Sequence, residues 1–335
     1  MDQQTQSRLR TWLQAQQIIG TDELSVKALT GGQSNPTYLL TSGTKKFVLR
    51  KKPDGVLQKS AHAIDREYRV ISALKNTAVP VPDAMVWCDD ESIVGTPFYL
   101  MSFLDGRVFV DQSLPGMTAE QRADIYLEMN RVISELHQLD IDTIGLGDYG
   151  KREDYLSRQI NRWSSQLSAS TIPVSDGALR LMDWLPVNLP PSQRAALIHG
   201  DFRLDNLVFD SSEPRVIGVL DWELSTIGDP VSDFAYHCMS WHIPHSLWRG
   251  IAGLNLSQLG IPEESTYKQK YFERRAPIDI AAWRFYLAFN LFRMSAILHG
   301  IGERAQQGNA NAADAVQTGA KAKPLAELGC EIAGI

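Results

Sequence analysis

The pattern of apolar and polar positions predicts a β-rich beginning. Short runs of β-branched and aromatic residues alternate with glycine, proline and polar turns, which is typical of strands. Two segments instead space their apolar residues three to four apart, as amphipathic helices do. The predicted strands cover residues 25–29, 38–40, 46–50, 84–88 and 96–106, and the predicted helices cover residues 7–17 and 61–76.

After residue 104 the apolar spacing is mostly helical. Thr118 and Gln121 form a capping box that begins one long helix. The last helix is apolar nearly all round and is expected to be buried and to end at Gly300. We expect the polar residues that interrupt it, such as Asn290 and Arg293, to pair within the core. The predicted helices cover residues 118–139, 155–167, 176–185 and 279–298.

The stretch 195–223, AALIHGDFRLDNLVFDSSEPRVIGVLDWE, breaks this helical pattern. An apolar run ends in His-Gly-Asp, and two short β-branched runs are joined by a polar turn, which predicts a hairpin. Asp201 and Asn206 leave one end of this hairpin, and Asp221 returns to the same end.

That arrangement suits phosphoryl transfer. The chemistry needs a carboxylate that orients and deprotonates a hydroxyl, and hard oxygen ligands for Mg²⁺. Asp201 is the candidate base, and Asn206 and Asp221 are the candidate metal ligands. The spacing Asp-x-x-x-x-Asn matches the kinase catalytic loop, with Gly200 in place of its Arg. Each residue alone is more often a turn or cap residue, but their order at strand ends favours the catalytic interpretation.

Composition narrows the class of protein. A chain of 335 residues is long enough for two lobes, and 44% hydrophobic and 21% charged residues are ordinary for a globular protein. A net charge of −6 argues against nucleic acid as the main partner. No apolar run is long enough for a membrane span, and no secretory signal is visible. The three scattered cysteines indicate free thiols and a cytoplasmic location. The oligomeric state is not indicated.

The strings HGDFRLDNLVFD and VIGVLDWELSTIGDPVSDFAY resemble the aminoglycoside phosphotransferase/choline kinase family of small-molecule kinases. Within that family they are most similar to the kinase-like domain fused to some acyl-CoA dehydrogenases and to its bacterial relatives. The resemblance covers about residues 29–304. It implies an α+β, protein-kinase-like fold with ATP and Mg²⁺ between two lobes. Residues 1–104 would form the nucleotide-binding lobe and hinge, with an antiparallel sheet and a helix, and residues 105–335 the mostly helical catalytic lobe.

The resemblance also implies a nucleotide-binding set. Gly31, Gly32 and Ser34 would fold over the phosphates, although a plain hairpin turn has the same sequence signature. Arg50 stands where kinases have a Lys, on the strand face opposite Leu49, with Lys52 as a substitute. Glu67 of the following helix would pair with Arg50.

Further roles come from the resemblance alone. Backbone groups at the hinge, around Met101, Ser102 and Phe103, would bind the adenine. Asp233 would hold the catalytic loop through backbone amides. Glu223 is a weaker candidate for a second metal.

Other motifs receive structural interpretations. G-x-G-x-x-G at 145–150 follows a helix rather than a strand, so we expect a loop and not a dinucleotide site. We expect His137 to be structural. A group of His and Cys side chains fits no zinc spacing, and we expect a helix turning into a loop that contributes at most to the acceptor pocket. Its members are His237, Cys238, His242 and His245.

We therefore expect an ATP- and Mg²⁺-dependent phosphotransferase that acts on a hydroxyl of a small molecule, with hydroxyacyl or other hydroxylated metabolites favoured. Eleven residues separate Asp221 from Asp233 and no A-P-E follows, which disfavours a protein substrate. The alternatives are an aminoglycoside-type antibiotic phosphotransferase, a nucleotide-binding pseudokinase without turnover, and a metallohydrolase using His199 and Asp201.

Overall fold

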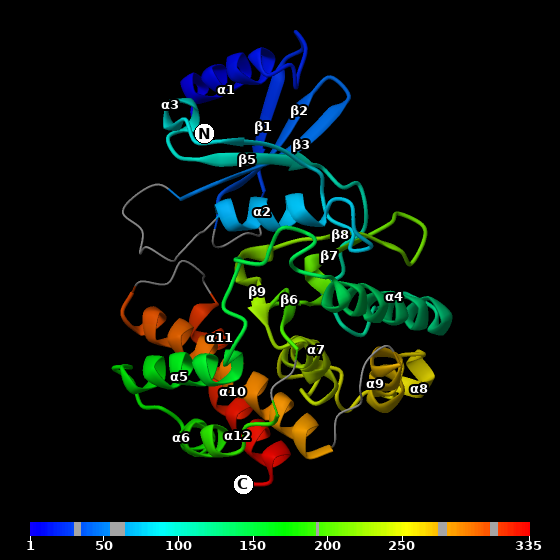
Figure 1. Cartoon of the computed structure of the whole chain (residues 1–335), viewed down its shortest axis with the longest axis vertical. Coiled ribbons are helices and arrows are strands. Elements are labelled where there is room, and N and C mark those ends of the chain that lie inside the picture. The colour runs from blue at the N-terminus through cyan, green and yellow to red at the C-terminus, as the bar shows by residue number, and fades with distance from the viewer. Residues whose placement is uncertain (30–34, 54–63, 192–193, 274–279, 309–313) are drawn as a thin grey trace. The chain divides into compact units, whose positions relative to one another are not determined.

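The computed structural model describes residues 1–29, 35–53, 64–191, 194–273, 280–308 and 314–335 (Figure 1). They form two compact units. Unit 1 comprises Met1–Arg107, Ile144–Leu146 and Asn206–Ser225, and unit 2 comprises Val108–Thr143, Gly147–Asp205 and Thr226–Ile335. The backbone therefore passes between the units several times.

A five-stranded sheet is the centre of the described part of unit 1, with strand order β1-β2-β3-β5-β4 and antiparallel neighbours throughout. The predicted strands are all present, although the last is confined to five residues of the expected range 96–106. Their bounds are β1 Leu24–Ala28, β2 Thr37–Ser42, β3 Lys45–Lys51, β4 Ala84–Cys88 and β5 Phe98–Ser102.

The two faces of this sheet carry different side chains. One face buries an apolar cluster in which Phe47 and Leu49 of β3 pack with Leu9 and Leu13 of helix α1 (Gln3–Ala15). The short helix α3 (Glu91–Val94) packs against α1. Helix α2 (Ile64–Leu74) packs against β4 and β5 (Figure 1). The alternation of side chains along β3 thus separates Phe47 and Leu49 from Arg50, as predicted.

The hairpin of β7 (Leu207–Phe209) and β8 (Val216–Val219) belongs to unit 1. Phe209 and Arg107 exchange N–H···O bonds of 2.8 Å, and the Val219 N–H donates to the Pro80 carbonyl at 2.8 Å. Gly218 lies directly against Leu104, where a Cβ atom would clash. The chain first passes from unit 1 to unit 2 after Arg107, and these backbone bonds attach the later hairpin to unit 1. The domain boundary at 104/105 stays a prediction.

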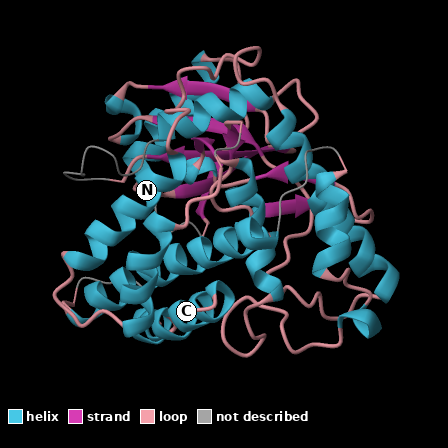
Figure 2. Ribbon diagram, turned by 60° about the horizontal axis from the view of Figure 1, so that its bottom comes forward, coloured by secondary structure: helices cyan, strands magenta, loops and turns pink. Residues whose placement is uncertain are grey.

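Unit 2 is mostly helical (Figure 2). One two-stranded pair, β6 (Ala196–Ile198) with β9 (Thr226–Gly228), lies among the helices. The Thr118–Gln121 capping box is present. The helices are α4 Ala119–Gln138, α5 Tyr155–Ser168, α6 Asp176–Trp184, α7 Pro230–Cys238, α8 Leu256–Leu259, α9 Glu264–Phe272, α10 Ile280–Gln306, α11 Ala315–Ala320 and α12 Ala322–Ala333.

Helix α10 is the core of unit 2 and packs against α5, α6, α7, α11 and α12. The predicted end at Gly300 is wrong, because the helix continues to Gln306. A glycine inside a helix costs about 1 kcal/mol relative to alanine. Here the missing side chains permit close packing, because a Cβ on Gly319 of α11 would overlap the backbone of Gly302. Tertiary contact therefore outweighs the local stop signal.

Two findings concern membrane-spanning helices and disulfides. No helix in the described ranges is long and apolar enough to cross a membrane. All three cysteines are buried free thiols, as predicted.

Candidate active site

Unit 1 contains a buried ion pair between strand β3 and helix α2. The side chain of Arg50 is 9% exposed and that of Glu67 is 1% exposed. Arg50 Nε lies 3.2 Å from Glu67 Oε2, and Arg50 Nη2 lies 3.4 Å from Asp221 Oδ1. The predicted pairing of Arg50 with Glu67 is therefore confirmed. The Nε–Oε2 contact lacks hydrogen-bond geometry, so this attraction is Coulombic.

Negative charge predominates around this pair. Burial raises the pKa of Glu67 to about 7, against the attraction of Arg50, and the nearby carboxylates of Asp221 and Glu223 contribute to the rise. Burial alone would lower the pKa of the Arg50 guanidinium, but the surrounding acidic groups, led by Glu67, outweigh burial. The net pKa is raised, so Arg50 stays protonated. Three carboxylates around one guanidinium favour the binding of a further cation.

The β7–β8 hairpin brings Asn206 and Asp221 together. The Leu220 N–H donates to the Asn206 carbonyl at 2.8 Å, which places the residues on either side of the hairpin at one end, as predicted. Asp221 has a left-handed backbone with φ of 64°, a conformation that costs energy for a residue with a Cβ. The next residue, Trp222, is fully buried and its Nε1–H donates to the Val219 carbonyl at 2.9 Å. This anchor fixes the carboxylate beside Arg50.

In unit 2, strand β6 leads into the loop that carries Asp201. Asp233, in the first turn of α7, accepts the backbone N–H of His199 at 2.9 Å and of Gly200 at 2.8 Å. Arg293 of α10 donates to the Gly200 carbonyl at 2.7 Å. The expected role of Asp233 as the residue that holds this loop is confirmed. Asn290 and Arg293 pair within the core, also as predicted.

Asp201 itself receives two donors. Arg203 Nη2 donates to Asp201 Oδ2 at 2.9 Å, and Arg203 Nε lies 2.8 Å from Oδ1. The hydroxyl of Tyr236 donates to Oδ1. Asp201 is 17% exposed at the side chain, so its carboxylate is held but not sealed from solvent.

Comparison with known proteins gives the family. A family model described as a phosphotransferase enzyme family matches residues 25–263. The chain belongs to this phosphotransferase family. Mouse (Mus musculus) acyl-CoA dehydrogenase family member 10 is 45% identical over 307 residues, which cover 90% of this chain and 28% of the mouse protein. The chain spans between 28% and 41% of the length of the curated relatives it matches.

Solved structures agree on the fold. A protein from Ralstonia eutropha JMP134, classed provisionally as an aminoglycoside phosphotransferase, is 46% identical, with 98% of each chain covered and a TM-score of 0.89. The GDP complex of aminoglycoside 2'-phosphotransferase-IIIa is 18% identical, with a TM-score of 0.61 over 97% of this chain and 99% of that one. The α+β, protein-kinase-like fold expected from the resemblance is confirmed, and the chain is a phosphotransferase by family.

The predicted nucleotide-binding residues of the phosphotransferase are only partly placed. Gly31, Gly32 and Ser34 lie outside the described residues. Met101 is buried on β5 opposite Val48. The Ser102 N–H donates to the Asp83 carbonyl at 3.0 Å, so that donor is already used. Phe103 follows β5, and their part in nucleotide binding stays a prediction.

Three side chains near the predicted set were missed. Arg203 and Tyr236 contact Asp201, and the only sequence signal was the place of Arg203 two residues after the predicted base. Asn35, which directly precedes the Pro before β2, is 1% exposed, and neither side-chain amide atom has a hydrogen-bond partner among the residues that the structure describes. A buried amide without partners is costly, which marks Asn35 as a candidate ligand contact.

The histidine group lies at the end of α7 and in the loop that follows, as predicted, and its histidines have hydrogen-bonding partners in unit 2. His237 Nε2 lies 2.8 Å from the Tyr267 hydroxyl, His242 Nε2 lies 3.0 Å from Glu264 Oε1, and His245 Nδ1 lies 3.1 Å from the Gly250 carbonyl. His137 is buried between Tyr271 and Asp233. Within the described residues, no cluster of three or more His, Cys, Asp or Glu side chains could hold a metal ion.

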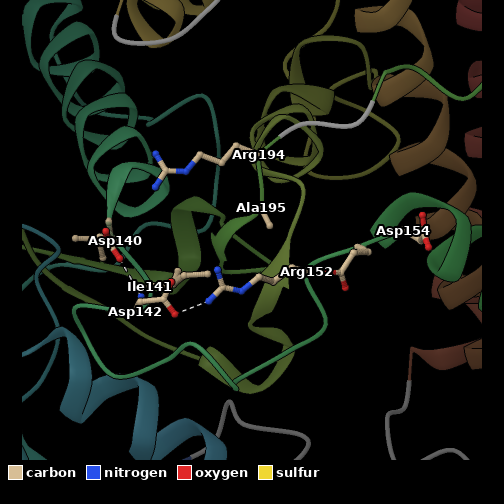
Figure 3. Close-up of a pocket in the computed structure, with 9 residues that line it drawn as sticks. Asp140, Ile141, Asp142, Arg152, Asp154, Arg194 and Ala195 are labelled. Carbon is tan, nitrogen blue, oxygen red and sulfur yellow. Dashed lines mark hydrogen bonds and ion pairs between the residues drawn. The ribbon is translucent and has the colours of Figure 1, made fainter.

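One well-formed cavity does not coincide with the candidate residues. It has a volume of about 440 Å³, lies in unit 2, and is lined by the loop after α4, the residues that precede α5, and Arg194 and Ala195 before β6 (Figure 3). Arg152 and Asp142 form an ion pair across it, with Arg194 above (Figure 3). Its lining includes neither Asp201, Asn206 nor Asp221. We interpret it as a solvated depression that this ion pair braces.

The motif at 145–150 lies in the loop between α4 and α5, as predicted. Gly145 adopts a left-handed φ of 74°. Because no strand precedes it and no helix begins at its last glycine, the dinucleotide interpretation is wrong.

Proposed function

We propose that this phosphotransferase moves the γ-phosphoryl group of ATP to a hydroxyl of a small molecule. The observation that carries the proposal is the shared hairpin end of Asn206 and Asp221, next to the buried Arg50–Glu67 pair. An amide oxygen and a carboxylate are hard oxygen donors of the kind that Mg²⁺ prefers. The surplus of negative charge around Arg50 supports the same assignment.

Each residue then has a defined task. Asp201 accepts the proton of the attacking hydroxyl, and the hydroxyl oxygen of the acceptor bonds to the γ-phosphorus. The bond between the γ-phosphorus and the β–γ bridging oxygen breaks at the same time, which releases ADP. Arg50 contributes positive charge toward the nucleotide phosphates, and Glu67 fixes its orientation. Asn206 and Asp221 would hold Mg²⁺, which when bound neutralises charge on the phosphate oxygens.

The segment after Asp221 supports a small acceptor. Residues 222–224 form a 3₁₀ turn, β9 follows at once, and α7 begins at Pro230. These elements account for nearly the whole interval between Asp221 and Asp233, so no extended loop is available there to present a protein substrate.

The acceptor class is part of the proposal. The identity to acyl-CoA dehydrogenase family members, which are much longer than this chain, favours hydroxyacyl or other hydroxylated metabolites. The likeness to a protein classed provisionally as an aminoglycoside phosphotransferase makes antibiotics the second candidate.

The test is a screen for nucleotide consumption that depends on an acceptor. Hydroxy acids, hydroxyacyl-CoA thioesters, amino alcohols and aminoglycosides are each supplied with ATP or GTP at several Mg²⁺ concentrations. We expect turnover with ATP and a hydroxylated metabolite, its loss in EDTA, and a much higher Mg²⁺ requirement for Asp221→Asn. Turnover with aminoglycosides alone would establish the second candidate. Nucleotide binding without turnover on any acceptor would contradict the proposal and indicate a pseudokinase.

A further inference from the structure

Unit 2 carries a row of alternating charges that begins at the proposed base. Arg203 contacts Asp201, as described above, and its Nη1 also lies 3.5 Å from Asp205 Oδ2. Asp205 Oδ2 in turn lies 3.1 Å from Arg249 Nη1. The row Asp201–Arg203–Asp205–Arg249 therefore places each cation next to one or two carboxylates.

The loop that carries this row is fixed from its other side. Phe202 and Leu204, which alternate with the charged residues, are completely buried. The ring of Phe202 packs edge-on against His199 and His237. Because Phe202 and Leu204 point into the core, the side chains of residues 201, 203 and 205 lie on the other side of the loop, where Arg203 contacts both aspartates.

Arg249 closes the far end of the row at a conformational cost. Its backbone has a left-handed φ of 48°, which is uncommon for a residue with a long side chain. Its guanidinium lies 5.3 Å from the centre of the Trp248 ring. Strained residues persist where their surroundings over-determine them, so the position of Arg249 is a built feature of this loop.

Tyr236 is the second side chain described on the Asp201 carboxylate. Its ring is 2% exposed, and the guanidinium of Arg293 lies 5.3 Å from the ring centre. Burial, followed by the charge of Asp201, raises the pKa of the Tyr236 phenol well above its ordinary value. The phenol therefore stays protonated and donates to the Asp201 carboxylate.

A guanidinium and a phenol on one carboxylate restrict its rotation. A base needs that restriction if the acceptor hydroxyl is to meet it at a fixed point. An ionised carboxylate has sites for about four hydrogen bonds, so these two donors do not by themselves exclude the acceptor.

We propose that Arg203 and Tyr236 are positioning residues that hold the carboxylate of Asp201 in a fixed orientation toward the acceptor hydroxyl. The inference rests on the proposed function, because it assigns Asp201 as the base. Other charged and titratable groups of unit 2 lie around the loop rather than on this carboxylate. His199 Nδ1 accepts the backbone N–H of Asp201, Arg293 donates to the Gly200 carbonyl, and Asp205 and Arg249 continue the row. Removal of Arg203 takes away a cation in direct contact with Asp201.

The test separates kcat from KM for the acceptor and includes rescue by a conservative variant. In Arg203→Gln we expect kcat to fall about 10- to 100-fold, because the carboxylate loses its fixed orientation. Tyr236→Phe should lower kcat by less, and Arg203→Lys should recover part of the loss. The KM for ATP should change little, because the predicted nucleotide contacts lie elsewhere in the chain. Arg152→Gln, which breaks the exposed ion pair with Asp142, is the matched control and should leave kcat and KM unchanged.

A second measurement does not need turnover. The carboxyl carbon of Asp201 can be observed at pH 7 by NMR in protein labelled at aspartate carboxyl groups, with its resonance identified by its loss in Asp201→Asn. A carboxylate held by both donors should give one narrow resonance, which should shift and broaden in Arg203→Gln and, by less, in Tyr236→Phe. If the resonance is the same in these variants as in the wild type, the inference is wrong even where kcat falls. If the wild type transfers phosphate to no acceptor, the proposed function fails, and the carboxyl resonance still decides whether Arg203 and Tyr236 hold Asp201.

Discussion

Asp233 gives a sharp test of how the fold holds the proposed base. Its carboxylate is completely buried, and its two oxygens accept the N–H groups of His199 and Gly200 and face Nε2 of His137 at 3.1 Å. We consider Asp233→Asn, which keeps the size and shape of the side chain. One of the two oxygens then becomes an amide nitrogen, a donor that meets a backbone donor.

The magnitude follows from the lost bonds. A hydrogen bond to a charged group contributes about 1.5–3 kcal/mol, and a buried N–H left without a partner costs about 1–3 kcal/mol. Asp233→Asn forfeits one such bond and leaves one N–H unpaired, so we expect a loss of about 3–5 kcal/mol in the free energy of unfolding. For a unit of this size, that corresponds to a fall of roughly 6–20 °C in the melting temperature.

The assay is denaturant unfolding at pH 7 with a matched control. Asp111 also accepts a backbone N–H, from Ser113 at 2.8 Å, but it lies at the surface, where an asparagine can make the same turn. Asp111→Asn should therefore cost less than about 1 kcal/mol. Asp233→Asn should also lower kcat by loosening the loop, with little change in nucleotide affinity. Equal destabilisation by the two variants would refute the idea that Asp233 holds the catalytic loop.

Two further predictions concern other buried groups. Arg50→Met should destabilise unit 1 by about 3 kcal/mol and weaken nucleotide binding, because it leaves the buried Glu67 without its cation. In denaturant melts, the double variant Arg50→Met/Glu67→Gln should recover most of the stability. If the two single effects simply add, the pairing is contradicted. Burial lowers the pKa of His237 to about 4, below the ordinary 6.5. The unfolded chain therefore binds this proton first as the pH falls from 6.5 towards 4, so His237 should remove about 2 kcal/mol of stability between pH 7 and pH 5. Urea melts of His237→Gln should show a flatter dependence over that interval, and an identical slope would show that His237 is not the source.

Much of the site was predictable because its residues follow local patterns. Two β-branched runs with polar ends fixed the hairpin, and with it the shared end of Asn206 and Asp221. Strand alternation placed Arg50 opposite Leu49, and the order of strand and helix placed Glu67 within reach. These predictions need only a period of two, a period of 3.6 and the direction in which a hairpin returns.

The remainder depends on contacts between distant segments. Tyr236 lies 35 residues after Asp201, and nothing in either sequence neighbourhood indicates that their side chains meet. The continuation of α10 past Gly300 depends on helices packing at glycine, which local helix signals do not contain. The hairpin joins unit 1 through backbone bonds to residues a hundred or more positions earlier. The apolar pattern predicted the strand that contains Ser102. It could not predict that the Ser102 N–H donates to the carbonyl of Asp83, which precedes the adjacent strand.

The most direct test of the account is whether Asp201 is needed to form a phosphate ester. Wild-type protein and Asp201→Asn are incubated with Mg-ATP and the acceptor that the screen identifies, and the phosphorus-31 NMR signal of the ester is followed over time, with nucleotide affinity measured in parallel. We predict an ester signal for the wild type and formation at least about 100-fold slower for Asp201→Asn, with nucleotide affinity retained. Ester formation at the wild-type rate in Asp201→Asn would contradict the account.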